Sequence, residues 1–107
     1  MMKMMDTEQI IKIGKALSDQ NRVEIMKLLS EEELCACHIL EQFEIAQSTL
    51  SHHMKQLTDS KLVNVSKKGK WCYYSINPDT IDSFKEFLDT CKVTENKNRC
   101  DCQTKCD

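Results

Sequence analysis

The chain has 107 residues, a formal net charge of −2 and seven cysteines. This length fits one small domain with a modest core. No stretch approaches the ~20 apolar residues of a membrane span, and the first residues lack the apolar run of a signal peptide. We therefore expect a cytoplasmic protein that does not associate with a membrane.

The charge is unevenly distributed along the chain. Residues 47–74 hold five lysines against one aspartate, a net charge of +4. Residues 1–46 have a net charge of −4, and residues 75–107 have −2. Phosphate contact depends on local field more than on total charge, so the middle segment predicts a nucleic-acid partner.

Three helices are predicted in the first part of the chain. Apolar residues at helical spacing predict a helix over 7–17 and a second over 20–29. Ser30 and Glu33 have the spacing of a capping box. This spacing predicts that a third helix opens at Ser30 and runs over 30–43.

A fourth helix is predicted from Gln47 to about Ser60, after a tight turn. Leu50, Met54 and Leu57 form its apolar edge. The opposite, polar edge carries Ser48, Ser51, His52 and Lys55. Two short helices joined by a short turn, the second with a polar outer face, predict a helix-turn-helix.

A basic hairpin follows the fourth helix. Alternating and aromatic residues predict two strands over 63–76, with the turn over 67–70. Asn77 and Pro78 suit the start of a last helix, over 79–91. Lys67, Lys68 and Lys70 are predicted to contact phosphate, whereas Trp71 and Tyr73 are predicted to pack on the hairpin.

The predicted fold is mainly α with a small β-hairpin, in the order α-α-α-α-β-β-α. It is a winged helix-turn-helix domain over residues 1–92, followed by a flexible cysteine-rich tail over 93–107. The first and last helices have apolar faces that the central motif does not need. These faces predict a homodimer and consist of Ile10, Ile13, Leu17, Ile81, Phe84 and Leu88.

An odd number of cysteines without a secretion signal favours reduced thiols over a disulfide framework. Cys35 and Cys37 fall on the predicted third helix, where residues two apart point about 200° from each other. We therefore expect joint ligation of one ion to distort that helix. Thiolates select soft, thiophilic ions.

The remaining cysteines and histidines are interpreted by their surroundings. The polar tail carries Cys100, Cys102 and Cys106. They are interpreted as a thiolate site, either separate or shared with the first pair, and the alternative is that they are incidental. Cys72 and Cys91 are interpreted as packed thiols. His38 is a capping or surface residue, or a nitrogen ligand. His53 is expected to pack.

Three segments together resemble one family. They read ALSDQNRVEIMKLL, ELCACHIL and QSTLSHHMKQLTDSKLV, and a basic hairpin follows them. The combination resembles the ArsR/SmtB family of metal-responsive winged-helix repressors. The ELCxC element resembles the branch that senses arsenite, antimonite, cadmium or lead.

The resemblance implies a homodimer that binds double-stranded operator DNA and represses until metal binds. It implies Cys35 and Cys37 as metal ligands. It also implies a DNA-facing set, namely Gln47, Ser48, Ser51 and His52, to which the charge pattern adds Lys55 and the wing lysines.

The chain also departs from this pattern. The founding arsenic sensors of the family carry C-x-C-x-x-C, and Leu40 occupies the third position here. The N-terminal arm has no cysteine of the kind that cadmium and lead sensors use. The last helix has no histidine, which argues against the family's zinc site.

The sequence therefore predicts a repressor that arsenite or antimonite releases from DNA, with no organic cofactor. Alternatives are a cadmium- or lead-responsive repressor, a thiol redox-sensing repressor, and a cysteine-rich metal buffer without DNA binding. We see no enzyme, because the sequence has no nucleophile and base pair, phosphate loop or catalytic carboxylate pair in a supporting motif.

Overall fold

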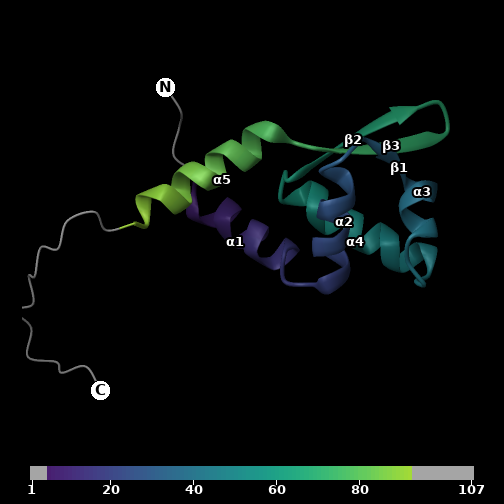
Figure 1. Cartoon of the computed structure of the whole chain (residues 1–107), viewed down its shortest axis with the longest axis horizontal. Helices are drawn as coiled ribbons and strands as arrows, with labels where there is room; N and C mark the ends of the chain where they lie inside the picture. The colour runs from purple at the N-terminus through teal and green to yellow at the C-terminus, as the bar shows by residue number, and fades with distance from the viewer. Residues whose placement is uncertain (1–4, 93–107) are drawn as a thin grey trace, which may run out of the picture.

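The computed structural model describes residues 5–92. Five helices and a three-stranded antiparallel sheet form one winged helix-turn-helix unit (Figure 1). The predicted fold class is thus confirmed, with one strand more than predicted. The elements are α1 (Thr7–Ala16), α2 (Gln20–Leu29), β1 (Leu34–Cys35), α3 (Ala36–Glu41), α4 (Gln47–Asp59), β2 (Val63–Lys68), β3 (Trp71–Ile76) and α5 (Pro78–Thr90).

The first two helices begin at aspartate caps. The Asp6 carboxylate accepts from the backbone N–H of Gln9, and the Asp19 carboxylate accepts from that of Arg22. Such a cap satisfies an N–H group that has no partner inside the helix. The predicted bounds of the second helix are those of α2.

The start of the third helix was predicted wrongly. Ser30 does not open a helix, because its hydroxyl donates to the Lys27 carbonyl at 2.6 Å and Ser30 itself is the C-cap of α2. The next residues extend instead, and Leu34 and Cys35 form β1. The helix begins only at Ala36.

Strand β1 joins the wing. It pairs antiparallel with β3, with Leu34 opposite Tyr74 and Cys35 opposite Tyr73. The sheet order is β1-β3-β2, so β3 lies in the middle. The wing is the hairpin of β2 and β3. The strand that contains Cys35 is therefore hydrogen-bonded to one of the two wing strands.

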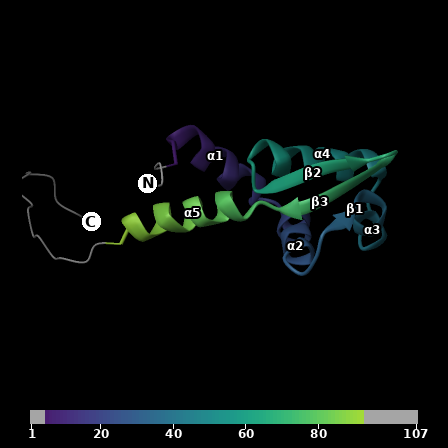
Figure 2. The same cartoon turned by 90° about the horizontal axis from the view of Figure 1, so that it is seen from above.

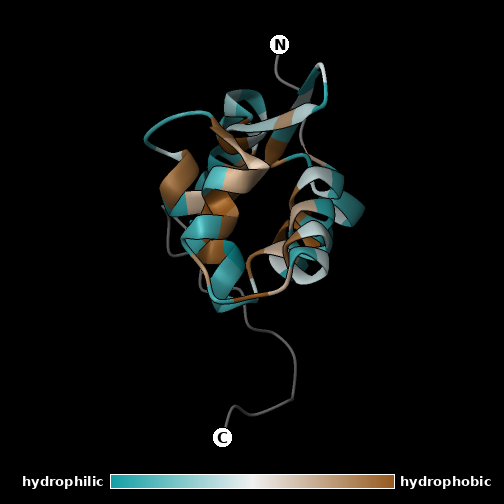
Figure 3. Cartoon of the chain, turned by 90° about the vertical axis from the view of Figure 1, so that its right-hand side faces the viewer, coloured by the Kyte–Doolittle hydropathy of each residue, from teal (hydrophilic) through white to brown (hydrophobic). Residues whose placement is uncertain are grey.

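The core lies between the helices and one face of the sheet. In α4 the predicted apolar edge is buried. Figure 3 shows hydrophobic and hydrophilic residues alternating along the helix ribbons, as amphipathic helices require. The core cluster consists of Ile13, Ala16, Ile25, Leu29, Ile39, Leu50, Met54, Leu57, Leu62 and Val63.

The hairpin turn is shorter than predicted. Lys67 and Lys68 belong to β2, and only Gly69 and Lys70 connect the strands. Of these two, only Gly69 has a positive φ, at +66°. This pattern is that of a type II′ turn, which needs glycine at its first central position.

Helices α1 and α5 lie toward the end of the molecule away from the hairpin tip (Figures 1 and 2). Asn77 caps α5 and Pro78 is its first residue, as predicted. Ile13 is fully buried in the core of a single chain, so its assignment to a dimer face was wrong. The exposed apolar residues on these helices are Ile11 (51% exposed) and Leu88 (48%). No helix within residues 5–92 is long and apolar enough to cross a bilayer.

Candidate metal centre and nucleic-acid interface

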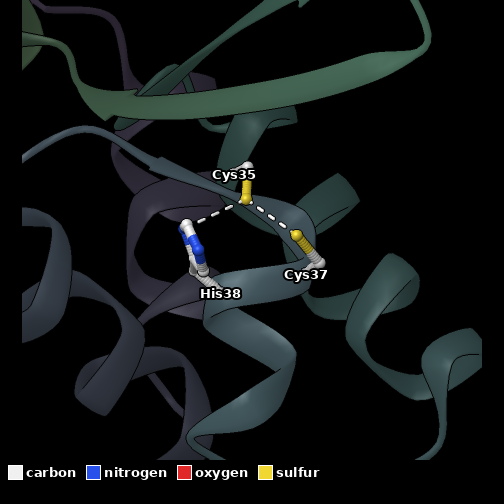
Figure 4. Close-up of side chains that lie close together, drawn as sticks. All are labelled: Cys35, Cys37 and His38. Atoms are coloured by element: carbon white, nitrogen blue, oxygen red, sulfur yellow. Dashed lines mark hydrogen bonds between the residues drawn. The ribbon is translucent and has the colours of Figure 1, made fainter.

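Two thiols and an imidazole converge where β1 meets α3 (Figure 4). Sγ of Cys35 lies 2.9 Å from Sγ of Cys37 and 3.2 Å from Nδ1 of His38. The three ligand atoms lie within 4.8 Å of one another. Cys35 is buried, whereas Cys37 and His38 are exposed. The cluster has one protected sulfur and an open side through which an ion can enter.

The two sulfurs meet because Cys35 is not on a helix. It is the N-cap of α3, with an extended backbone (φ −80°, ψ 159°). The expected separation of about 200° holds only for two residues of a regular helix. The expectation that joint ligation distorts the helix start was therefore wrong: both sulfurs already face the same point.

The thiol pair is electrostatically asymmetric. A hydrogen bond from the Cys37 thiol lowers the pKa of Cys35, and the backbone N–H groups of His38 and Cys37 lower it further. The same hydrogen bond raises the pKa of Cys37, and desolvation adds to that effect. When the pair loses a proton, the favoured form is therefore a Cys35 thiolate that accepts from the Cys37 thiol. A thiolate is the form that binds soft metal ions.

The other cysteines differ in position. Cys72 is half-buried in β3. Cys91 is exposed after α5, so its interpretation as a packed thiol was wrong for the single chain. The tail motif of Cys100, Cys102 and Cys106 lies outside the described residues.

The polar edge of α4 faces outward. The exposed residues of this edge are Gln47, Ser48, Ser51, His52 and Lys55. His53, one residue further round, is only 6% exposed and packs, as expected. Within residues 5–92, the N-cap Ala46 provides no side-chain hydrogen bond, and the first turn of α4 carries no acidic residue. Its first N–H groups are thus open to an anion such as phosphate.

The wing carries exposed lysines at its tip. Lys67, Lys68 and Lys70 are all exposed. Nζ of Lys68 lies 3.5 Å from Oε1 of Glu33 and 5.0 Å from the centroid of the Tyr73 ring. Lys68 is therefore partly engaged within the protein. Trp71 is 51% exposed, which contradicts the expectation that it packs on the hairpin.

A hollow that the sequence did not predict lies between α3, α4 and β3. Its volume is ≈ 360 Å³. Residues of both candidate sites line it: Cys37 from the metal cluster, Gln47 and Ser51 from the polar edge of α4 (the reading edge), and Lys70 from the wing. Cys72 lines it as well. The hollow depends on the pairing of β1 with β3. Residue spacing along the chain does not predict this pairing.

Curated proteins with similar sequences are named as repressors of arsenical resistance operons. The chain is 42% identical over 96 residues to an arsenical resistance operon repressor of Staphylococcus xylosus, covering 90% of this chain and 92% of the relative. It is 41% identical to the protein of the same name from Staphylococcus aureus, covering 92% and 93%. The family model described as bacterial regulatory protein, arsR family, matches residues 19–65. The chain belongs to the arsR family.

Solved structures of arsR-family regulators share the fold. The crystal structure of one ArsR-family transcriptional regulator superposes with a TM-score of 0.75 at 22% identity, covering 82% of this chain and 91% of that one. A homodimeric winged helix-turn-helix DNA-binding domain from Mycobacterium bovis gives a TM-score of 0.65 at 26% identity, covering 78% of each chain. The arsR-family assignment makes this chain a DNA-binding transcription regulator.

Proposed function

We propose that this arsR-family protein represses an arsenic-resistance operon. As a homodimer it binds operator DNA, and arsenite or antimonite releases it by binding Cys35 and Cys37. One observation carries the proposal: the two sulfurs lie 2.9 Å apart at the junction of β1 and α3, inside the DNA-binding motif. The staphylococcal relatives named as arsenical resistance operon repressors support the choice of ion.

The position of the pair connects ligation to DNA binding. Cys35 is hydrogen-bonded through β1 to β3 of the wing, and Cys37 lies on α3, the first helix of the reading motif. An ion held by both sulfurs fixes the geometry of this junction. An ion that prefers the junction of the free protein over that of the DNA-bound protein must lower DNA affinity by the same factor.

The exposure and charge of the side chains indicate which residues contact DNA. The outer edge of α4 provides Gln47, Ser48, Ser51 and His52 for base edges in the major groove. Phosphate contacts come from Lys55 beside that edge and from the wing lysines, which fix the protein on the duplex. A twofold dimer places two copies of this surface on a symmetric operator.

We also propose that the tail cysteines bind thiophilic ions. Cys100, Cys102 and Cys106 stand among polar residues, where few apolar neighbours favour simple packing. They add thiolates either as a second cluster or by joining the Cys35–Cys37 centre. If they join that centre they raise its affinity for the ion, and in either case the pair at the α3 junction transmits binding to the DNA-reading elements.

A cadmium-responsive repressor is the second candidate. The chain is 37% identical over 78 residues to a CadC homologue of Staphylococcus aureus, a cadmium resistance regulatory protein, and covers 64% of it. Two local thiolates, the His38 imidazole and the tail together give cadmium enough soft ligands. The inducer is therefore decided by titration.

The test is operator release from the full-length protein under a non-thiol reductant. Arsenite, antimonite, cadmium and zinc are titrated separately, and a parallel sample receives peroxide without metal. We expect arsenite and antimonite to release DNA at the lowest concentrations. The Cys35→Ser/Cys37→Ser variant should bind the operator and no longer respond, while Cys91→Ser, an exposed thiol far from the cluster, should respond normally. A double variant that still releases DNA at the wild-type arsenite concentration contradicts the proposal, and release by peroxide alone indicates a redox sensor.

A further inference from the structure

Cys37 and Cys72 come from different elements but line the same hollow. Cys37 is the exposed member of the thiol pair on α3, and Cys72 is a half-buried residue of β3. Apolar side chains form much of the wall between them: Leu40 on α3, Leu50 on α4, and Tyr74 on β3. Cys37 and Cys72 therefore border one shared volume.

The strand register places Cys72 next to Tyr73, the strand partner of Cys35. Leu34 pairs with Tyr74 and Cys35 with Tyr73, so the two chains run in opposite directions. The pairing ends at Cys35, and the next residue of each chain, Ala36 and Cys72, lines the hollow. Cys37 follows directly.

A trivalent arsenic centre can form one more bond to sulfur than the Cys35–Cys37 pair supplies. Arsenite has three hydroxyl groups, and each can be exchanged for a thiolate. Cys35 and Cys37 account for two, and on α3 the position one turn further holds Leu40. His38 lies close to Cys35, but a soft, thiophilic centre prefers sulfur over an imidazole nitrogen.

We propose that Cys72 is the third thiolate of the arsenite site. This inference rests on the proposed function of the Cys35–Cys37 pair. Three As–O bonds break and three As–S bonds form. Each thiol proton leaves with one hydroxide as water, so three waters are released and arsenic stays trivalent. All three sulfurs then come from the folded domain, so arsenite needs no tail cysteine to complete its three bonds.

The location of Cys72 gives ligation a direct effect on DNA reading. A bond between an ion on α3 and Cys72 on β3 crosses the hollow that Gln47, Ser51 and Lys70 also line. Drawing Cys72 toward Cys37 moves β3 relative to α4. The wing and the recognition helix then no longer match the spacing of phosphates and bases that the operator requires.

The experiment counts sulfur ligands in a full-length protein with few competing thiols. Cys91, Cys100, Cys102 and Cys106 are all replaced by serine, which leaves Cys35, Cys37 and Cys72. Arsenite is bound under a non-thiol reductant, and arsenic X-ray absorption reports the number of sulfur neighbours. We expect three sulfurs in this protein, and two sulfurs with one oxygen or nitrogen after Cys72→Ser or Cys72→Ala.

Operator release provides the second readout. The arsenite concentration for half-release should rise by more than about tenfold in Cys72→Ser, because loss of even an outer-sphere partner costs a metal site about 10–100-fold. Operator affinity without arsenite serves as the check that the variant is folded, and Cys91→Ser alone is the matched control.

The outcomes separate this inference from the proposed function. The sulfur count can stay the same after Cys72 is replaced while the response still needs Cys35 and Cys37. That result overturns the role of Cys72 and leaves the proposed function standing. A normal arsenite response after Cys35→Ser/Cys37→Ser overturns the proposed function and this inference with it.

Discussion

Arg22 Nη1 lies 3.0 Å from Nδ1 of His53, on the buried side of the recognition helix α4. The same guanidinium donates to the carbonyl of Ala16 through Nε at 2.7 Å and to that of Lys15 through Nη2 at 3.1 Å. One side chain of α2 therefore binds both the last carbonyls of α1 and the back of α4. This contact holds the reading edge in its orientation, because it fixes the face opposite to it.

The contact makes stability depend on pH through His53. A guanidinium can only donate, so Nδ1 accepts and the ring is neutral. Burial lowers the pKa of His53; the Asp19 carboxylate opposes this effect, and the charge of Arg22 adds to it. The unfolded state then binds more protons below the ordinary histidine pKa, so the free energy of unfolding should decrease as pH falls through about 6.5. Urea unfolding between about pH 7.5 and 5.5 measures this decrease.

A matched pair of variants assigns the effect to this histidine. His53→Gln keeps an oxygen that can accept from Arg22 and removes the titration, so its pH dependence should be flatter. His52→Gln changes an exposed neighbour on the reading edge and should keep the wild-type dependence. Parallel pH curves for His53→Gln and the wild type would assign the titration to another group.

A second prediction concerns the end of α4. Lys61 follows the C-cap Ser60 and has a φ of 67°, in the left-handed region. This region costs a residue with a side chain about 1–2 kcal/mol, and the freedom that glycine adds to the unfolded chain offsets about 0.4–1 kcal/mol of it. Lys61→Gly should therefore raise the free energy of unfolding by up to about 1.5 kcal/mol. Gly69→Ala, at a φ of +66° in the hairpin turn, should lower it. Urea unfolding of both variants provides the check, and a destabilised Lys61→Gly contradicts it.

Part of this fold could be predicted from local signals. The bounds of α2, the cap at Asn77 and the two edges of α4 follow from residues close in sequence, and the structure agrees with them. Strand β1 could not be predicted this way. It has two residues, too few for any periodicity, and it exists because β3, almost forty residues further on, offers hydrogen bonds to it.

The error over β1 led to the error in the cysteine geometry. Treating Cys35 as helical separated it from Cys37, whereas its extended backbone brings the two sulfurs together. The hollow that Cys37 and Cys72 both line was missed for the same reason, because the pairing of β1 with β3 brings α3 beside β3. By contrast, the outward position of the α4 polar edge needed only helical spacing, and there the sequence sufficed.

A third prediction concerns the homodimer that we propose. Ile11 on α1 and Leu88 on α5 are about half exposed, and both helices lie toward the end of the molecule away from the hairpin tip. Burying these side chains against a second copy removes apolar surface from water. Ile11→Glu and Leu88→Glu should shift sedimentation toward monomer at micromolar concentration and weaken operator binding.

The control for this prediction is Val65→Glu, which places the same charge at a similarly exposed apolar residue, on β2. It should remain dimeric. Ile13→Ala is expected to lower the free energy of unfolding by about 2–5 kcal/mol instead, because Ile13 belongs to the core. A wild-type protein that sediments as a monomer at micromolar concentration removes the basis for the dimer.

A fourth prediction concerns the specificity of α4. Ser48 and His52 are exposed on its polar edge, where they can reach base edges in the major groove. Ser48→Ala or His52→Ala should change the preferred bases at one position of each half-site, by about 1–3 kcal/mol for each lost base contact. Binding to unrelated DNA should not change. Selection of operators from a random library measures the preference, and an unchanged selected sequence excludes the residue from base reading.

The last prediction concerns which lysines of the wing contact DNA phosphates. Lys67 and Lys70 are exposed near the hairpin tip, whereas Lys68 lies against Glu33 and the Tyr73 ring. A lysine that neutralises a phosphate releases counterions, so its loss flattens the salt dependence of binding by about 0.9 per contact. Lys67→Gln and Lys70→Gln should each weaken binding to all DNA sequences and flatten this slope, for both wings of a dimer. Lys68→Gln should have a smaller effect, because Lys68 must first leave Glu33. Affinity measured across a salt series for the three variants, with exposed Lys12→Gln on α1 as control, tests the order. Equal slopes for the wild type and the Lys67→Gln/Lys70→Gln variant would place the wing off the phosphate backbone.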